Sequence, residues 1–338
     1  MKLSEVMELS SADLIKKSDS KNLSITTCKT FLENESSLID QKLNRGNVNK
    51  ILNARTKIND TAVIKIAEKF FENQKKYISL IAIGGYGRKE LYPNSDTDLL
   101  ILIEGKKKKL LQKPIREFLT FLWDVGIEAS HSTRTLNECL KEGRKDVSVA
   151  TSLIESRYLY GSKDLFKRFL EKINKNGAFW RNKKFLEEKM LEQTNRHLQF
   201  NNTAYNLEPN IKNGPGGLRD LHNIFWIAKK IFSIKSIKEL ENLKILTKEQ
   251  IKDFESSWAL LSRIRYSLHK ITNRTENRLL FDYQRTLASN FGYKDQKHLL
   301  AVEVFMQDYY KAAKSISRLN EISLQTVSYT HLTLPTKA

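Results

Sequence analysis

The spacing of apolar residues changes twice along the first half of the chain. From about residue 22 to residue 76, apolar side chains recur every three or four positions and predict helices. Two short apolar runs rich in β-branched residues follow, at 78–83 and 98–103, and predict buried strands. A helical face over 111–122 and a strand-like segment over 126–133 complete this part. The order strand, loop, strand, helix, strand predicts a domain that combines a sheet with helices.

The second half has helical periodicity from about residue 150 almost to the end. A turn-rich stretch from Asn206 to Gly217 interrupts it and predicts a loop inside a helical domain. Three long helical faces follow, the first over 218–232 and the last over 302–316. Before the middle one, Thr247 and Gln250 have the spacing of a capping box, which marks a helix start.

These patterns predict an α+β protein with four segments. We expect a helical N-terminal segment over residues 1–76, a mixed-sheet domain over 77–150 and a helical-bundle domain over 151–326. The periodicity is lost over 327–338, which end in a Ser/Thr/Pro mixture, and we interpret this tail as non-native.

Composition and charge narrow the function classes only slightly. The 58 Lys and Arg residues exceed the 39 Asp and Glu residues, which gives a net charge of +19 and favours anionic partners. Because Lys, Asn and Ile recur throughout, this excess also fits a codon bias, and a nucleic-acid partner is not predicted. Cys28 and Cys139 stand alone, which excludes a disulfide framework or zinc module, and no apolar run reaches membrane-spanning length. We expect a cytoplasmic protein without a membrane partner.

A glycine-rich turn and two aspartates carry the candidate chemistry. Gly84 and Gly85 end the first predicted strand, and Asp96 and Asp98 precede the second. Two-residue spacing puts both carboxylates on one side of a strand, where they can share divalent metal ions. The glycines let the backbone approach a polyphosphate, with Arg88 as a charged clamp. Together these features predict nucleotidyl transfer with two Mg²⁺ or Mn²⁺ ions.

Each half of this motif alone would have an ordinary explanation. An Asp-x-Asp sequence commonly caps a loop, and Gly-Gly commonly makes a turn. Their combination between two strands favours the nucleotidyltransferase site.

The third predicted strand offers Glu128 as a third carboxylate for the metal ions. Ser130, Ser132 and Arg134 alternate onto the same face, so Arg134 is a candidate triphosphate ligand. The competing interpretation is a surface Glu–Arg pair. His131 alternates to the opposite face and is interpreted as a packed or solvent-facing histidine.

The loop before residue 218 has two open interpretations. Gly216 and Gly217 allow unusual backbone angles just before a helix, whose N-terminus favours an anion, with Arg219 and Asp220 in its first turn. This suits a nucleotide or substrate contact that would also include Asn210. An ordinary helix-entry loop, in which Asp220 stabilises the helix dipole, is the alternative.

Four sequence motifs together resemble the N-terminal half of the bacterial P-II uridylyltransferase/uridylyl-removing enzymes. The motifs are Gly84-Gly85-Tyr86-Gly87-Arg88 with Ser95-Asp96-Thr97-Asp98; Phe121-Leu122-Trp123-Asp124 through His131-Ser132-Thr133-Arg134-Thr135; Tyr205-Asn206-Leu207-Glu208-Pro209-Asn210 through Gly214-Pro215-Gly216-Gly217-Leu218-Arg219-Asp220; and Arg278-Leu279-Leu280-Phe281-Asp282. The resemblance covers about residues 25–326. The chain departs from the family at Lys89, where the family usually has glycine, and at Ala129.

The resemblance implies a nucleotidyltransferase fold and a specific reaction. UTP would donate UMP to a tyrosine hydroxyl of the trimeric signalling protein P-II, with Asp96, Asp98 and Glu128 as metal ligands. Gly84, Gly85, Arg88, Ser95 and Arg134 would bind the nucleotide. Complete family members continue into an HD hydrolase domain and two ACT domains. Because this chain stops before them and contains no His-Asp dipeptide, we expect neither uridylyl removal nor glutamine sensing.

Two other function classes remain compatible with the sequence. A related nucleotidyltransferase could use ATP or modify another protein or an RNA end, because the metal site does not distinguish these substrates. A basic module could also hold nucleotides without turnover.

Overall fold

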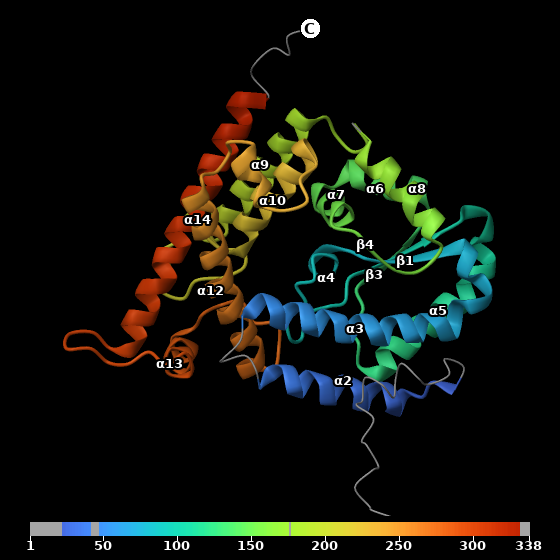
Figure 1. The fold of residues 1–338 in the computed structure, drawn as a ribbon, viewed down its shortest axis with the longest axis horizontal. Helices are drawn as coiled ribbons and strands as arrows, with labels where there is room; N and C mark the ends of the chain where they lie inside the picture. Colours follow the sequence, from blue (N-terminus) through green and yellow to red (C-terminus); the bar gives the residue numbers. More distant parts are fainter. Residues whose placement is uncertain (1–21, 42–46, 176, 332–338) are drawn as a thin grey trace, which may run out of the picture. The chain divides into compact units, whose positions relative to one another are not determined.

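The computed structural model describes residues 22–41, 47–175 and 177–331, and within them the chain forms two compact units (Figure 1). The first unit consists of described residues up to Leu91, together with Ser95–Gly143 and Glu155–Ile173. The second contains Tyr92–Asn94, Arg144–Ile154 and the described residues from Asn174 onward. The first unit is thus built around a sheet, and the second is helical.

The sheet of the first unit has four strands in the order β3-β2-β1-β4. β1 (Ile78–Ala82) runs antiparallel to both β2 (Leu99–Ile103) and β4 (Arg157–Gly161), and β2 runs parallel to β3 (His131–Arg134). Every residue of β1 and β2 is buried, as expected for continuous apolar strands covered on both faces. The mixed sheet confirms the predicted α+β class.

Helices pack against this sheet to form the core of the first unit. α2 (Ile25–Asp40), α3 (Val48–Phe71) and α5 (Lys108–Val125) contact one another, and the rings of Phe71 and Phe118 lie 4.9 Å apart. The shorter elements of the unit are η2 (Glu72–Tyr77), α4 (Gly84–Gly87), η3 (Gly105–Lys107), α6 (Leu136–Lys145), whose last two residues fall in the second unit, and α8 (Lys163–Asn174). The predicted N-terminal helical segment is therefore part of the sheet domain for its described residues.

The second unit is built from helices, of which α14 (Ala301–His331) is the longest among the described residues. α14 packs against α10 (Leu218–Phe232), α12 (Lys248–Thr272) and α13 (Phe281–Asn290). The remaining helices are α7 (Val147–Ile154), α9 (Asn182–Leu198) and α11 (Glu239–Asn242). The capping box predicted from Thr247 and Gln250 is confirmed at the start of α12.

The structure corrects three boundaries drawn from the sequence. β4 lies beyond residue 150, where only helices were expected, and it completes the sheet instead of opening the helical domain. β3 spans only His131–Arg134 of the segment predicted from Gly126. α14 continues past residue 326, with Val327 buried, so the helix does not end at the predicted start of the tail. Residues 1–21 and 332–338 lie outside the described part of the chain.

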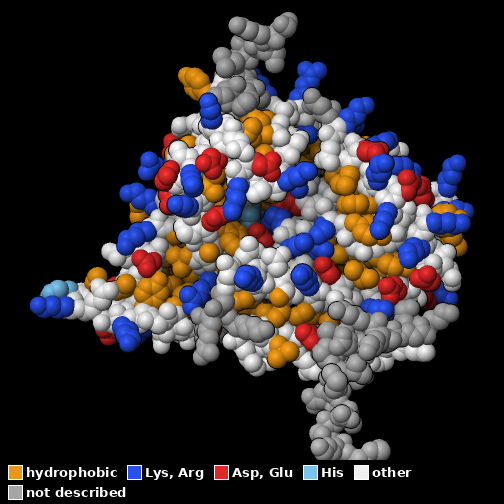
Figure 2. Space-filling model, in the orientation of Figure 1, with side chains coloured by type: hydrophobic (Ala, Val, Ile, Leu, Met, Phe, Trp, Pro, Cys, Tyr) orange, Lys and Arg blue, Asp and Glu red, His pale blue; other side chains and the backbone are white. Residues whose placement is uncertain are grey.

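Charge and hydropathy on the described residues agree with the composition. Lys and Arg side chains are spread across the face shown in Figure 2. Cys28 and Cys139 are buried free thiols, and burial raises their pKa values to about 11 and about 12. Within the described ranges, no helix is both long enough and apolar enough to span a bilayer.

Candidate active site

The short helix α4 (Gly84–Gly87), which follows β1 and is called the glycine turn below, has glycine at two positions where a side chain would clash. Gly84 has a φ of +55°, and a Cβ built on it would lie 2.9 Å from Asp98 Oδ2. A Cβ on Gly87 would lie 2.2 Å from the backbone oxygen of Glu155. Glycine is therefore required at residue 84 because its backbone lies against the Asp98 carboxylate, and at residue 87 because its backbone lies against the backbone of Glu155.

Backbone hydrogen bonds set the relationship between the carboxylates. Thr97 N donates to Glu128 O at 2.7 Å, and Leu99 N donates to Ser130 O at 2.8 Å. These bonds continue the parallel β2–β3 register beyond the N-terminal ends of the two strands. Asp96 therefore lies opposite Glu128, and Asp98 lies opposite Ser130.

Because strand side chains alternate, these opposed positions share one face of the sheet. The exposure pattern agrees with this assignment. Asp96 and Glu128 are exposed and Asp98 is half-buried, whereas Thr97, between the two aspartates, and Ile127, directly before Glu128, are buried. Three carboxylates therefore lie on one face of two adjacent strands, which are spaced about 4.8 Å apart.

Ser95 adds a polar group beside these carboxylates. Its Oγ is buried, and among the described residues it has no hydrogen-bond partner. A buried hydroxyl of this kind, beside Asp96, suits a site that is completed by a ligand. Within the same described residues, no three His, Cys, Asp or Glu side chains are already gathered as the ligands of one metal ion. The metal role of Asp96, Asp98 and Glu128 therefore stays a prediction.

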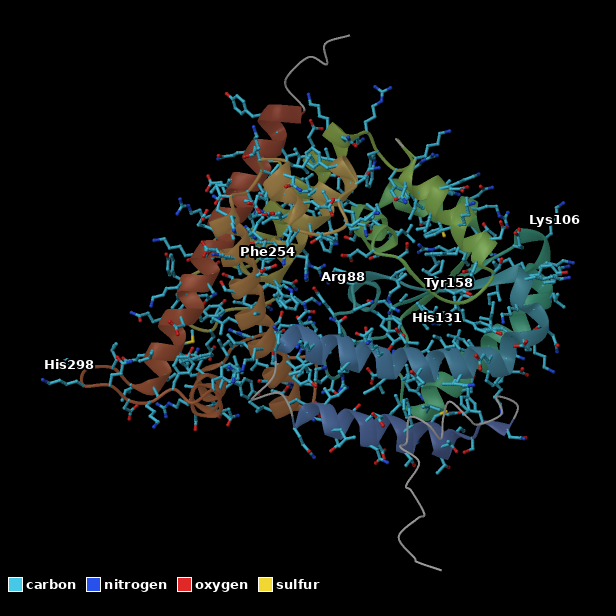
Figure 3. The ribbon with its side chains drawn as sticks, in the orientation of Figure 1. Arg88, Lys106, His131, Tyr158, Phe254 and His298 are labelled. Atoms are coloured by element: carbon cyan, nitrogen blue, oxygen red, sulfur yellow. The ribbon has the colours of Figure 1, made fainter. Side chains whose placement is uncertain are left out.

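Arg88, which is labelled in Figure 3 and was predicted as a phosphate clamp, forms ion pairs with two carboxylates. Its Nε and Nη2 each donate to Glu90 Oε2 at 3.1 Å, and its Nη1 donates to the buried Glu155. Burial alone would lower the pKa of Arg88, but the charges of Glu155 and Glu90 outweigh it and raise that pKa. Arg88 can reach a phosphate only if these contacts rearrange, so its nucleotide-binding role stays a prediction.

A second arginine, which the sequence did not single out, fixes the glycine turn. Arg157 donates to both carboxylate oxygens of Asp60, at 2.7 and 3.0 Å. The same guanidinium donates to Tyr86 O at 3.1 Å and to Gly87 O at 3.4 Å. A bidentate pair of this kind holds its arginine rigidly, so it positions the turn backbone. Asp60 and Arg157 are 97 residues apart, and no local pattern links them.

The structure does not bring Arg134 to the carboxylates. Arg134 pairs with Leu102 at the far end of β3, six residues beyond Glu128. That separation corresponds to about 20 Å along a strand. His131 is exposed on the opposite face from Ser132, as predicted, and lines a cavity of about 380 Å³ beside α5 (Figure 3).

The turn-rich loop before α10 is held by internal hydrogen bonds. Asn210 Oδ1 accepts from Lys212 N and Asn213 N, and Asn210 O accepts from Gly214 N. Gly216 has a φ of +72°, and a Cβ there would lie 2.4 Å from Ala313 O. A Cβ on Gly217 would lie 2.8 Å from the loop carbonyl oxygen of Gly214.

The N-terminus of α10 is closed by this loop. Leu218 N donates to Ile211 O, Arg219 N to Lys212 O and Asp220 N to Gly217 O. The expectation that the helix N-terminus offers its first amides to an anion is therefore corrected, because loop carbonyls already accept from them. The Arg219 guanidinium lies 5.3 Å from the centre of the Trp226 ring.

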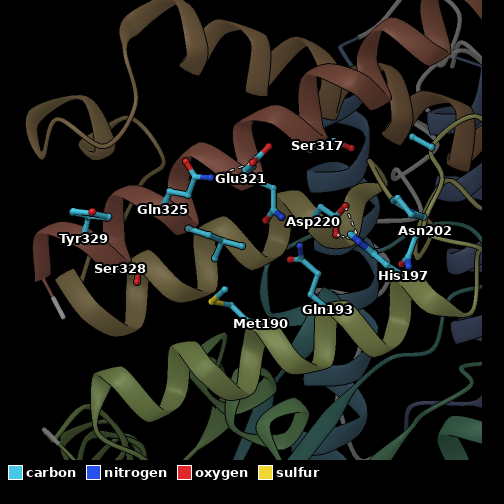
Figure 4. A pocket seen from close by; sticks show the side chains of 14 residues that line it. Met190, Gln193, His197, Asn202, Asp220, Ser317, Glu321, Gln325, Ser328 and Tyr329 are labelled. Atoms are coloured by element: carbon cyan, nitrogen blue, oxygen red, sulfur yellow. Dashed lines mark hydrogen bonds and ion pairs between the residues drawn. The ribbon is translucent and has the colours of Figure 1, made fainter. Parts of the chain in front are cut away.

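Asp220 is a fully buried anchor. Its Oδ1 accepts from Arg196 Nη2 at 2.7 Å and from His197 Nε2 at 3.0 Å, and its Oδ2 accepts from Gly216 N at 2.8 Å. Asp220, whose contact with His197 is drawn in Figure 4, also lies in the first turn of α10, as the alternative of an ordinary helix-entry loop requires. These bonds account for the loop structurally, and a substrate contact by Asn210, Gly216, Gly217, Arg219 and Asp220 stays a prediction.

Comparisons with known proteins agree with the motifs. Residues 184–324 match the family model described as GlnD PII-uridylyltransferase. The chain is similar to bifunctional uridylyltransferase/uridylyl-removing enzymes. It is 40% identical to the enzyme of Hydrogenovibrio crunogenus, in an alignment that covers 91% of this chain and 35% of the relative. It is 38% identical to the enzyme of Pseudomonas aeruginosa, with 90% of this chain and 34% of the relative covered. The relative from Nitrosococcus oceani is 45% identical, in an alignment that covers 73% of this chain and 28% of the relative. The chain thus spans about a third of the length of these relatives.

Proposed function

We propose that this chain, a homologue of the bifunctional uridylyltransferase/uridylyl-removing enzymes over about a third of their length, is a nucleotidyltransferase. It moves UMP from UTP to a tyrosine hydroxyl of the protein P-II and releases pyrophosphate. The family description names P-II as the kind of acceptor, and the glycine turn beside three carboxylates fits the chemistry.

The observation that carries this proposal is the shared face of Asp96, Asp98 and Glu128. Asp98 lies against the Gly84 backbone, so a metal bound to its carboxylate is also next to the turn that would approach a polyphosphate. Carboxylate oxygens are the preferred ligands of Mg²⁺ and Mn²⁺. The donor set therefore fits divalent cations.

Two such ions would lower the pKa of the acceptor hydroxyl and stabilise negative charge on the α-phosphate and the leaving pyrophosphate. The chain itself supplies orientation. In this proposal the backbone of Gly84 and Gly85, which carries no side chain, approaches the phosphates, Ser95 binds them once its buried hydroxyl is uncovered, and the Arg157–Asp60 pair holds the turn in place. The attack breaks the bond between the α-phosphorus and its bridging oxygen and forms a tyrosyl phosphodiester.

The competing functions differ from this proposal in the nucleotide donor, in the acceptor, or in whether any reaction takes place. A related enzyme could use ATP or modify another protein or an RNA end, and a binding module would hold a nucleotide without reaction. The cytoplasmic setting is part of our proposal, which the two buried free thiols support.

The test is a nucleotide panel offered with Mg²⁺ or Mn²⁺ and purified P-II. We expect P-II to gain UMP from UTP, measured by intact mass, with stoichiometric pyrophosphate release. Exclusive transfer from ATP, or none to P-II, would overturn the specific proposal. Nucleotide binding without any metal-dependent pyrophosphate release would favour the binding module.

A further inference from the structure

The strand β3 forms one edge of the sheet and is its least buried strand. Its four residues are exposed or half-buried, whereas β1 and β2 are buried throughout. Leu99 N donates to Ser130 O, and Leu99 lies opposite His131 in the parallel register. The N–H and C=O groups of His131 and Thr133 therefore point away from β2. Among the described residues, neither has a backbone partner on that outer side.

A groove of about 380 Å³ runs beside this edge, and we call it the edge groove. It lies between α5 and the face of β3 that carries the side chains of His131 and Thr133. Ile103, Ile115 and Leu119 give it an apolar floor. An unpaired edge is a template for a further strand, and a pocket next to it can receive alternate side chains of that strand.

The rim of the edge groove is basic. Lys108, Arg116 and His131 line it, and none of the described residues that line it is Asp or Glu. Arg116 is exposed and forms no ion pair within the described part of the chain, whereas Lys108 lies 3.5 Å from the exposed Glu138 carboxylate. Charge complementarity therefore favours a partner with acidic side chains here.

An exposed tryptophan continues the same surface. Arg116, Thr120 and Trp123 follow one another at helical spacing, so they share one stripe of α5. Trp123 is 74% exposed and lies in the last turn of α5, which leads into the segment with Glu128. Tryptophan and arginine are enriched among the residues that dominate protein–protein binding. The stripe thus has the composition of a protein interface.

The other face of the same edge belongs to the proposed transfer site. Glu128 and Ser130 lie on the sheet face of Asp96 and Asp98, opposite to the face of His131. The side chains of an added strand would alternate in the same way. One set would enter the edge groove, and the other would lie beside Glu128, one strand spacing of about 4.8 Å away.

We propose that the acceptor protein adds the segment carrying its target tyrosine to β3 as a further strand, a proposal that rests on the transfer function above. The acceptor main chain forms hydrogen bonds with His131 and Thr133. The residues on either side of the tyrosine enter the edge groove, where the floor selects apolar side chains and the rim selects acidic ones. The tyrosine itself lies on the opposite face, beside Glu128.

The first experiment measures UMP transfer by the whole chain at varied P-II concentration, with UTP and Mg²⁺. Arg116→Glu reverses the unpaired charge of the edge groove and should raise the KM for P-II about ten-fold. The kcat and the KM for UTP should not change, because the carboxylate face is untouched. Lys113→Glu is the matched control, since Lys113 is an exposed residue of α5 outside the groove lining. It should keep the wild-type KM for P-II.

A second variant tests the main-chain contact. His131→Pro removes an N–H that does not bond to β2, and proline is tolerated on an edge strand when its missing N–H faces outward. The KM for P-II should rise about ten-fold, as loss of one hydrogen bond implies. His131→Ala keeps the N–H and should raise this KM less.

Hydrogen exchange gives a direct measurement of strand addition that needs no turnover. Adding P-II to the whole chain without UTP should slow amide exchange over residues 130–134, because the outward N–H groups of β3 become hydrogen-bonded. The slowing should be lost in Arg116→Glu and kept in Lys113→Glu at a P-II concentration near the wild-type KM.

Two results would overturn the proposal: exchange over 130–134 that P-II does not slow, or an unchanged KM for P-II in both Arg116→Glu and folded His131→Pro. Self-association seen by light scattering and lost in His131→Pro, without protection by P-II, would assign the edge to a second copy of the chain. Protection by P-II without UMP transfer would refute the transfer function alone, and transfer without protection would refute this docking mode alone.

Discussion

A β-carbon on Gly84 would lie 2.9 Å from Asp98 Oδ2, so a side chain at residue 84 would clash with the Asp98 carboxylate. Gly84→Ala should therefore displace the Asp98 carboxylate and strain a backbone with a φ of +55°. We expect UMP transfer to fall about 100-fold, as for a small misplacement of a reacting group, with a loss of about 1–2 kcal/mol in stability.

Gly292→Ala is the matched control for this change. Gly292 also has a positive φ, of +81°, but a Cβ there meets nothing within 4 Å. It should lose similar stability and keep its transfer rate. Equal rate losses in both variants, measured as kcat beside a thermal melt, would show that backbone strain alone explains the effect.

The carboxylates should act as ligands and not as structural groups. Asp96→Asn, Asp98→Asn and Glu128→Gln should each reduce transfer by about a hundred-fold or more, because each removes a metal-ligand charge at nearly constant volume. Asp96 and Glu128 are exposed, so circular dichroism and melting should be close to wild type. Glu117→Gln, an exposed change on α5, serves as the control. Near-normal transfer by a folded Asp98→Asn protein would exclude the site.

The sequence predicted the elements whose information is local. β1 and β2 were recognisable because continuous apolar runs end at glycine or at charged residues, and α12 because Thr247 and Gln250 form a capping box. The face shared by Asp96 and Asp98 also followed from strand alternation.

The missed features depend on distant partners. β4 is a five-residue strand whose first two residues, Arg157 and Tyr158, are half-buried, so its pattern is too short and too polar to stand out from the helices around it. Arg157 acquires its role only when folding brings Asp60 to it. The residues around Asp220 do not indicate whether its side chain is exposed or buried. Its burial depends on the ion pair with Arg196, which lies on another helix.

Lys89 should be less favourable than glycine in its position. Its φ is +65°, a left-handed conformation that disfavours residues with a β-carbon, and the side chain is exposed. Lys89→Gly should raise stability by about 1 kcal/mol in chemical denaturation. Lys106→Gly, in η3 and without a positive φ, should give no such gain. A destabilised Lys89→Gly protein would mean that the side chain contributes more than the backbone strain removes.

Asp220 should matter for folding more than for chemistry. Asp220→Asn removes the nearer of the two carboxylates that pair with the buried Arg196, leaving Glu192 at 3.8 Å, and weakens the bond that fixes the Gly216 backbone. Breaking a buried ion pair typically destabilises by about 3–5 kcal/mol. We expect a loss of that order in urea unfolding of the helical unit, against no measurable change for the exposed Asp282→Asn. A stable Asp220→Asn protein without transfer activity would instead assign the loop to substrate binding.

His269 should make the helical unit sensitive to acid. The ring is buried, and its Nδ1 bonds to the carbonyl oxygen of Pro93. Burial, with the nearby charge of Arg265, lowers the pKa of His269 to about 4, below the value of about 6.5 for an unfolded histidine.

Between these two pH values the unfolded chain binds the proton and the folded chain does not, so stability falls as the pH drops from about 6.5 to 4. The loss attributable to His269 approaches about 3 kcal/mol at pH 4 and does not grow below it. Urea unfolding of wild type and His269→Gln at pH 7 and pH 4 measures this difference, because other titrating groups contribute equally to both proteins. The variant starts less stable at pH 7, since it loses the packed ring, but its stability should change less with pH. Identical pH dependence in the two proteins would show that the folded state accepts a proton on His269 without penalty.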